Sequence, residues 1–315
     1  MKPLRIGTRG SPLALWQARA VASALEKRGG PSCEVLTIRT TGDRLSAAVL
    51  SEVGGKSAFV KEIEQALLDD KIDLAVHSAK DLPAELPPGL SVCAALPRED
   101  PRDALALPAD RTKVGEHDAA ALVRAVGPEP RIGTGSVRRV AQLAPRFPSA
   151  RFEQIRGNVE TRLRKLDTGG YDLIVLAAAG LVRLGLANRI SVRLSFDDCV
   201  PAPGQGIVAI ETRTADRATA SVLSEINDPA ARASLDAERA LLIALGGDCH
   251  VPIGGVATPD GGNLALRAVV ASVDGSRVVR DEQHGPAGDA TRLGRQVADS
   301  LIAAGAADII AEHRQ

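Results

Sequence analysis

Short apolar runs alternate along the chain with stretches in which apolar residues recur at helical spacing. This spacing predicts helices over residues 59–70 and 158–167. Each is followed by an apolar run, at 72–76 and 171–176, of the kind that forms buried strands. The alternation predicts an α/β fold in which the sheets are mostly parallel.

Two segments near the starts of the predicted strand–helix units repeat one another. Residues 5–11 read RIGTRGS and residues 131–136 read RIGTGS, each ahead of a helical pattern. In the first copy, Ser11 is predicted to cap a helix that begins at Pro12. A helix start beside a strand end presents backbone N–H groups that suit an anionic ligand.

A second pair of repeated segments contains a difference that indicates functional residues. Residues 72–82 (IDLAVHSAKDL) match residues 171–181 (YDLIVLAAAGL). Lys80 and Asp81 therefore stand where the second copy has Ala and Gly, which would serve a strand end that only packs. Lys80 and Asp81 are predicted site residues, and the alternative is a surface ion pair at the start of a loop.

The repeats predict two similar α/β lobes followed by a small C-terminal α+β domain. Pro- and Gly-rich stretches at 97–101 and 201–206 are the predicted connections between the lobes. The expected limits are residues 1–101 with about 201–225 for the first lobe, 102–200 for the second, and 226–315 for the C-terminal domain.

The C-terminal region has a different pattern from the two lobes. A helix is predicted over 233–245, and strands over 263–272 and 277–283 are joined by a hairpin turn at Asp274-Gly275. A final helix over 289–312 is expected to be interrupted near Gly305.

Composition narrows the classes of function. Lys plus Arg and Asp plus Glu are equal at 39 each and aromatics are only 2%, which argues against a nucleic-acid-binding protein. No apolar run approaches the roughly 18 residues that span a bilayer, and charged residues come early, so no membrane association is predicted and a cytoplasmic location is expected. The four cysteines lack zinc-ligand or redox-pair spacing, and no metal site is predicted.

Several cations are candidates for binding carboxylate or phosphate groups, because guanidinium donors match these anions. Lys56, which follows two glycines, could reach the same site. Solvated surface charge is the alternative for most arginines, and it is weakest for Arg138-Arg139 beside the Gly/Ser turn. The candidate arginines are expected at a turn (Arg9) and at loop positions of the second lobe (Arg138, Arg139, Arg156, Arg162 and Arg183).

Cys249 lies in a turn-rich segment, LGGDCHVPIGG, within an otherwise regular region. The glycines and proline on either side predict a loop that presents the thiol, which could be a covalent attachment point. The alternative is a small buried cysteine. His250 is adjacent, and neighbours in sequence usually point apart, so a Cys–His nucleophile pair is not expected from these two.

Taken together, these residues resemble the porphobilinogen deaminase family. The resemblance runs nearly from end to end, and its specificity comes from the order and spacing of the motifs. The motifs are RGSPLALWQ from Arg9, GGK ending at Lys56, FVKE from Phe59, HSAKDLP from His77, REDPRD from Arg98, RGNV from Arg156, AGLVRLG from Ala179, PGQG from Pro203 and CHVPIG from Cys249.

The resemblance implies two lobes similar to type II periplasmic binding proteins and a C-terminal domain that carries a dipyrromethane cofactor on a thioether to Cys249. It implies head-to-tail addition of four porphobilinogen molecules with loss of ammonia, then release of hydroxymethylbilane by water. Asp81 would be the catalytic carboxylate. The residues that would hold cofactor and substrate are Arg9, Ser11, Lys56, Ser78, Lys80, Thr134, Ser136, Arg138, Arg139, Arg156, Arg162, Arg183 and Gln205.

The resemblance also implies a monomer that could hand its product to uroporphyrinogen III synthase. Three positions depart from the usual family residues: Glu52, Ala79 and Asp248. A non-catalytic two-lobed anion-binding protein is the main alternative, and it leaves the Lys80-Asp81 difference and the cysteine segment unexplained. A thiol-dependent hydrolase or transferase would need a His partner that the sequence does not identify.

Overall fold

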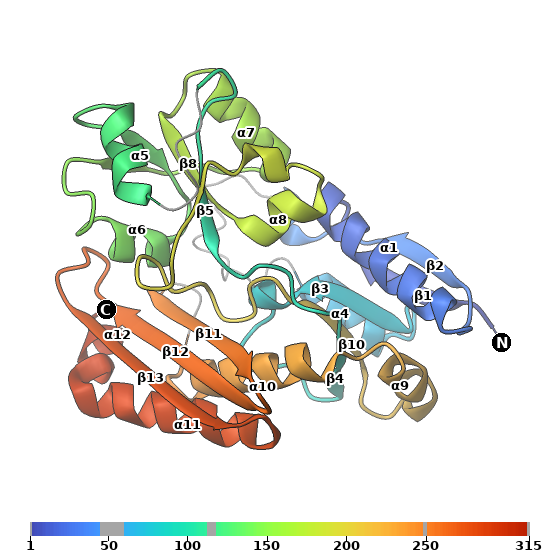
Figure 1. Ribbon diagram of the computed structural model, residues 1–315. Coiled ribbons are helices and arrows are strands. Elements are labelled where there is room, and N and C mark those ends of the chain that lie inside the picture. The colour runs from blue at the N-terminus through green and yellow to red at the C-terminus, as the bar shows by residue number, and fades with distance from the viewer. Residues whose placement is uncertain (1, 45–59, 112–117, 248–250, 314–315) are drawn as a thin grey trace.

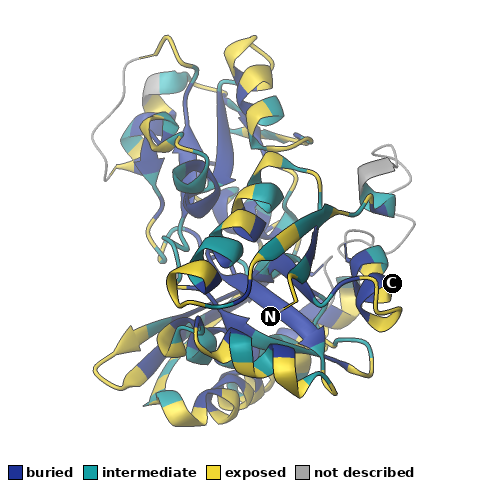
Figure 2. Ribbon diagram, turned by 90° about the vertical axis from the view of Figure 1, so that its right-hand side faces the viewer, coloured by how far each residue is buried: buried dark blue, intermediate teal, exposed yellow. Residues whose placement is uncertain are grey.

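The computed structural model describes residues 2–44, 60–111, 118–247 and 251–313 (Figure 1). Two lobes, each a five-stranded sheet with helices, are followed by a third domain built on a three-stranded sheet. The predicted α/β class with two lobes and a small C-terminal domain is confirmed. Figure 2 shows that buried residues fill the strands in the interior, whereas exposed residues follow the outer faces of the helices.

The sheet of the first lobe is parallel except for β10, which is antiparallel to both of its neighbours. Its strands, in spatial order, are β2 (Cys33–Thr37), β1 (Leu4–Thr8), β3 (Leu74–Ser78), β10 (Val208–Arg213) and β4 (Leu90–Ala95). Its helices are α1 (Pro12–Lys27), the short α2 (Thr41–Arg44), α4 (Lys61–Leu68) and α9 (Arg217–Ser224).

Helix α1 forms as the sequence predicts. The Ser11 hydroxyl accepts a hydrogen bond from the Ala14 N–H at 3.3 Å, and Pro12 takes the first helical position. Val21 and Leu25, on one helical face, pack with Ile6 of β1 in the core of the lobe. The strand end and the helix start are therefore held in fixed relation.

The sheet of the second lobe has the same arrangement, with β5 antiparallel in the position that β10 takes in the first. Its strands, in order, are β7 (Arg151–Glu153), β6 (Arg131–Gly133), β8 (Leu173–Ala177), β5 (Asp103–Ala106) and β9 (Val192–Arg193). Its helices are α5 (Ala119–Val126), α6 (Val137–Leu143), α7 (Val159–Asp167) and α8 (Ala178–Arg183).

The internal repeat extends to side chains. In the first lobe Asp73 accepts from the Arg5 backbone N–H at 2.7 Å and from its Nε at 3.1 Å. In the second, Asp172 accepts from the Arg131 backbone N–H at 2.8 Å and from its Nε at 3.5 Å. The same contact thus joins the first strand of each repeat to the start of its next parallel neighbour.

Two crossovers connect the sheets. The chain leaves the first sheet through residues 96–102 and returns through residues 194–207, the stretches that contain the Pro- and Gly-rich segments. The crossovers touch: the Glu99 N–H donates to the Gly206 carbonyl at 3.0 Å. Gly206 has φ +87°, and a Cβ there would lie 2.2 Å from the Glu99 carbonyl oxygen. Only glycine allows this approach.

The third domain packs helices against an antiparallel meander, which Figure 1 shows at the lower left, below the second lobe. The strands are β11 (Ile253–Asp260), β12 (Asn263–Ala271) and β13 (Val278–Pro286), and the helices are α10 (Pro229–Ala244), α11 (Ala290–Leu301) and α12 (Ala307–His313). Burial alternates along β13, as expected for a strand with one solvated face.

The third domain differs from its prediction in two places. Helix α10 begins four residues earlier than expected, because Asp228 caps it and Pro229 takes its first position. Strand β11 was not predicted, because the sequence Gly254-Gly255 is typical of a turn. A Cβ on Gly255 would lie 2.8 Å from the Leu241 side chain of α10, so glycine is needed there for the helix to pack against the sheet. The break near Gly305 is confirmed, with φ +97°.

Candidate functional site

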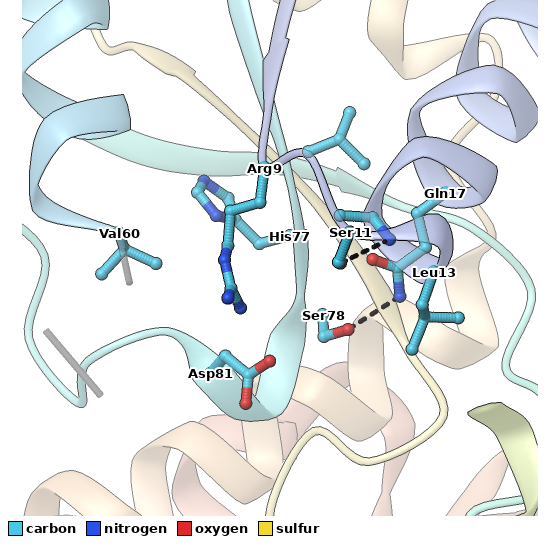
Figure 3. Close-up of a pocket in the computed structure, with 10 residues that line it drawn as sticks. Arg9, Ser11, Leu13, Gln17, Val60, His77, Ser78 and Asp81 are labelled. Carbon is cyan, nitrogen blue, oxygen red and sulfur yellow. Dashed lines mark hydrogen bonds between the residues drawn. The ribbon is translucent and has the colours of Figure 1, made fainter. Parts of the chain in front are cut away.

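The candidate site begins where β1 and β3 of the first lobe end. Arg9 and Ser11 follow β1, whereas Ser78 ends β3 and leads into a single 3-10 turn, Ala79–Asp81. These residues line one pocket, and Figure 3 shows the Arg9 and Asp81 side chains extending toward one another within it. The fold therefore brings together four of the predicted site residues, Arg9, Ser11, Ser78 and Asp81.

Gln17 is a pocket residue that the sequence analysis did not single out. Its amide nitrogen donates to the Ser78 hydroxyl at 2.7 Å, from helix α1 to the end of β3 (Figure 3). A buried glutamine on an otherwise apolar helical face was the available signal. His77 also lines the pocket, and its Nε2 lies 3.1 Å from the buried Glu211 carboxylate.

Lys80 extends toward the crossover region, where its ammonium group donates to the Gln205 side-chain oxygen at 3.1 Å. Burial lowers the pKa of Lys80 to about 8. The Asp81 carboxylate opposes this shift, whereas the nearby cations Arg139 and Arg138 add to it. Lys80 is thus a cation in surroundings that disfavour its charge, and an added anion would stabilise it.

Arg138 and Arg139 do not lie in a loop, as was expected, but on the first turn of α6. The helix starts immediately after the Gly/Ser turn, so the residues that follow the turn are already helical. Both side chains are 5% exposed and pair with Asp103 of β5: Arg138 Nη2 lies 2.8 Å from Asp103 Oδ2, and Arg139 Nη2 lies 2.7 Å from Oδ1.

The remaining arginines of the second lobe also depart from the loop expectation. Arg162 lies on α7 and Arg183 is the last residue of α8, whereas Arg156 is in a loop and binds the Gln154 side-chain oxygen at 3.2 and 3.1 Å. Burial lowers the pKa of Arg162 to about 10, with Arg139 adding to the shift and Asp81 opposing it. Asp81 of the first lobe and Arg162 of the second therefore act on one another.

Arg183 connects the lobes directly. Its Nη2 donates to the Gly206 carbonyl at 2.7 Å, and its guanidinium carbon lies 5.4 Å from the centre of the Trp16 ring on α1. Burial lowers its pKa to about 10, opposed by Glu99. Arg183 thus contacts both the first lobe and the returning crossover.

The remaining described site residues, Thr134, Ser136 and Gln205, lie beside the turn after β6 or in the returning crossover. Thr134 is buried in the turn after β6, and its hydroxyl accepts from the Ser136 N–H at 3.3 Å; Ser136 precedes α6 without a side-chain cap. Gln205 is buried and contacts both Lys80 and Asp103. Lys56 and Cys249 lie outside the described residues, as do Glu52 and Asp248.

The donor set fits a ligand that carries several carboxylates. Lys80 and Arg162 hold positive charge that burial and neighbouring arginines disfavour, although Asp81 is close to both. Arg138 Nε is buried without a hydrogen-bond partner. Among the described residues there is no cluster of His, Cys, Asp or Glu that could hold a metal ion, and no helix is both long and apolar enough to cross a bilayer.

The fold and the site define a two-lobed α/β protein, with a third domain appended, that gathers cationic side chains around two carboxylates, Asp81 and Asp103, where its lobes meet. The chain belongs to the porphobilinogen deaminase family, whose members are transferases of tetrapyrrole synthesis. Residues 4–221 match the family model "Porphobilinogen deaminase, dipyromethane cofactor binding domain", and residues 233–303 match "Porphobilinogen deaminase, C-terminal domain".

Full-length relatives agree with this assignment. The chain is 47% identical over 312 residues to the porphobilinogen deaminase of Acidithiobacillus ferrooxidans, covering 99% of this chain and 98% of the relative. It is 45% identical over 316 residues to that of Syntrophomonas wolfei, covering 100% of both.

Solved structures are more distant. The periplasmic VFT2 domain of Bordetella pertussis BvgS is 17% identical over 71% of this chain and 86% of that domain, with a TM-score of 0.41. A full-length mutant of BenM is 16% identical over 71% of this chain and 66% of that chain, with a TM-score of 0.42.

Proposed function

We propose that the chain is a hydroxymethylbilane synthase. It joins four porphobilinogen molecules head to tail, with loss of ammonia at each addition, and releases hydroxymethylbilane by hydrolysis. The observation that carries this proposal is the position of Asp81, which lines a pocket with Arg9 and acts electrostatically on Lys80 of its own lobe and Arg162 of the other.

The internal repeat separates this position from an ordinary strand end. The matching segment of the second lobe continues into α8, and its Ala179 and Gly180 are buried in packing. In the first lobe the same position is a single 3-10 turn with Lys80 and Asp81 partly exposed. Packing alone does not account for Lys80 and Asp81 at this position, which favours a chemical role.

Asp81 is proposed as the catalytic carboxylate. Its charge stabilises the cation that develops on the substrate as ammonia leaves, and it holds the pyrrole N–H groups. A charge pair at ~4 Å in an effective dielectric of ~20 interacts by about 4 kcal/mol. If that interaction is realised only in the transition state, it corresponds to about three decades in rate.

The cationic and hydroxyl side chains are proposed to hold carboxylates. Porphobilinogen carries an acetate and a propionate, and guanidinium groups bind carboxylates through paired hydrogen bonds. Arg9, Ser11 and Ser78 serve the pocket beside Asp81, and Lys56 is assigned to the same site from family position. The second lobe supplies the rest: Thr134, Ser136, Arg138, Arg139, Arg156, Arg162 and Arg183, with Lys80 and Gln205 between the lobes.

The dipyrromethane cofactor is proposed to be attached to Cys249. When bound, it supplies the pyrrole from which the product chain is extended. The residues of this chain orient it through its carboxylates, and the buried, partnerless Nε of Arg138 is one donor that fits this role. A monomeric state, a cytoplasmic location and product hand-off to uroporphyrinogen III synthase stay predictions.

The intact denatured mass of the purified protein tests the proposal, with the Cys249→Ser variant as the control. An excess equal to two linked pyrroles on the wild type, absent from the variant, is the expected result. A bare chain mass that persists after incubation with porphobilinogen or hydroxymethylbilane contradicts the proposal and favours a non-catalytic anion-binding protein. An excess on both proteins contradicts attachment at Cys249 alone.

A further inference from the structure

Asp103, the first residue of β5, is fully buried and has no place in the reaction described above. Its Oδ1 accepts from Arg139 Nε at 3.1 Å and Nη2 at 2.7 Å, and from the Gln205 amide at 2.9 Å. Its Oδ2 lies 2.8 Å from Arg138 Nη2. One carboxylate thus fixes two arginines and one glutamine that are proposed to hold ligand.

Asp103 stays ionised inside the protein. Burial alone would raise its pKa, but Arg138 and Arg139 outweigh burial and hold the pKa well below its usual range. Asp103 is therefore an anion at every pH at which the protein is expected to work. It supplies inside the protein the same carboxylate chemistry that the ligand would supply from outside.

Asp103 also sits where the two crossovers meet. It follows residues 96–102 directly, and its partner Gln205 belongs to the returning crossover. The Gln205 side chain binds the Pro101 carbonyl at 2.7 Å and accepts from Lys80 at 3.1 Å. Asp103 is therefore connected through Gln205 to both segments that join the lobes.

The two arginines have other fixed donors. Arg138 Nη1 donates to the Val200 carbonyl at 2.6 Å, and Arg139 Nη1 donates to the Val175 carbonyl at 2.8 Å. These contacts hold each guanidinium in place while leaving the donors aimed at Asp103 available for exchange. A ligand carboxylate can reach these donors only in competition with Asp103.

We propose that Asp103 is a positioning residue that acts as a built-in stand-in for a ligand carboxylate on Arg138 and Arg139. Cofactor and substrate carboxylates bind these arginines by exchange with Asp103, and the exchange loosens the contact between the crossovers through Gln205. This inference rests on the proposed function, since it assigns the ligand carboxylates to that site.

The test is a thermal-unfolding cycle of four proteins: the wild type, Asp103→Asn, Cys249→Ser and the double variant. Without the cofactor, Asp103→Asn leaves two buried guanidinium groups uncompensated and should lower the Tm by on the order of 10 °C. In the loaded protein the ligand carboxylates pair with both guanidinium groups, so the same substitution should lower the Tm by about half as much or less.

A matched control is Asp172→Asn, which removes a carboxylate from Arg131 in the same lobe but away from the site. Its Tm loss should be the same in the loaded and the cofactor-free protein. An equal Tm loss for Asp103→Asn in both backgrounds would overturn the proposal and leave Asp103 a structural residue. A wild type that carries no added mass would instead contradict the proposed function.

If Asp103→Asn does not fold without the cofactor, Asp103→Glu decides the question. It keeps the charge, but its extra methylene prevents all of the present contacts from forming together. We expect a smaller Tm loss with the same dependence on loading. Steady-state kinetics of the loaded variants give a second readout. If the substituted residue 103 competes less well with substrate carboxylates for the two arginines, KM should fall by about threefold or more while kcat also falls. A general loosening of the site would instead raise KM.

Discussion

Arg98 and Glu238 form a two-point ion pair that joins the first crossover to helix α10 of the third domain. Arg98 Nη1 lies 2.6 Å from Glu238 Oε1, and Nη2 lies 3.3 Å from Oε2. Glu238 is fully buried and also accepts from the backbone N–H groups of Gly204 and Ala257. The third domain, the returning crossover and the first crossover therefore meet at one carboxylate.

Glu238→Gln should destabilise the protein by roughly 3–5 kcal/mol, because it leaves the Arg98 guanidinium without its buried counter-charge. Urea unfolding measures this loss. Asp236→Asn is the control on the same helix, since its ion pair with Arg232 is partly exposed and should contribute less than about 1 kcal/mol. Similar losses for the two variants would show that burial of Glu238 carries no special weight.

Asp81→Asn should lower kcat by at least about two decades, because the amide cannot stabilise the cation that develops on the substrate. The substitution preserves size, so the Tm should change little. Single-turnover rates of loaded protein provide the measurement. A near-normal rate would remove Asp81 from the catalytic role.

Lys80 should make substrate binding depend on pH. Because its folded-state pKa is about 8, against 10.5 for the free side chain, it loses its proton within the range of ordinary assays. KM for porphobilinogen should therefore rise about tenfold as pH increases from 7 to 9, the effect of losing one charge-assisted hydrogen bond. Lys80→Arg keeps the charge, and an equal rise of KM in that variant would assign the pH dependence to another group.

Glu64 should make stability fall as pH rises. Burial, and then the nearby Glu211, raise its pKa from 4.5 to about 7, opposed by His77. The unfolded state therefore loses its proton first, and stability decreases between pH 4.5 and 7 and is level above that range. Glu64→Gln should be more stable than the wild type by about 3 kcal/mol at pH 8, with little difference at pH 4.5.

Urea unfolding of Glu64→Gln and wild type at both pH values checks this prediction, because titrating groups that do not interact with Glu64 cancel in the difference. Glu211 and His77 act on Glu64, and Glu211 also acts on Arg239 of α10. A constant difference across the range would mean that Glu64 is not protonated in the folded state at neutral pH.

Local signals were sufficient to predict most of the architecture. Ser11 and Pro12 specify the start of α1 through contacts within a few residues, and the repeat exposes Lys80 and Asp81 as a difference between two copies of one fold. Asp103 was not predicted, because its partners lie far away in the sequence. Arg139, 36 residues away, is brought to it by the fold of the second lobe, and Gln205, 102 residues away, by the returning crossover. Strand β11 was missed for a related reason, since its glycines are required by packing outside the strand: Gly255 lies against Leu241 of α10, and Gly254 lies against Val200 of the returning crossover.

The antiparallel strand β10 has a consequence for how the protein is made. It lies between β3 and β4, inside the sheet of the first lobe, although it follows the whole of the second lobe in the sequence. All strands of the second lobe, by contrast, come from the continuous stretch between residues 103 and 193. During synthesis from the N-terminus the second lobe can close its sheet as soon as that stretch is available, whereas the first lobe must wait with a gap in its sheet. The lobe that carries Asp81 is thus the later of the two to be completed.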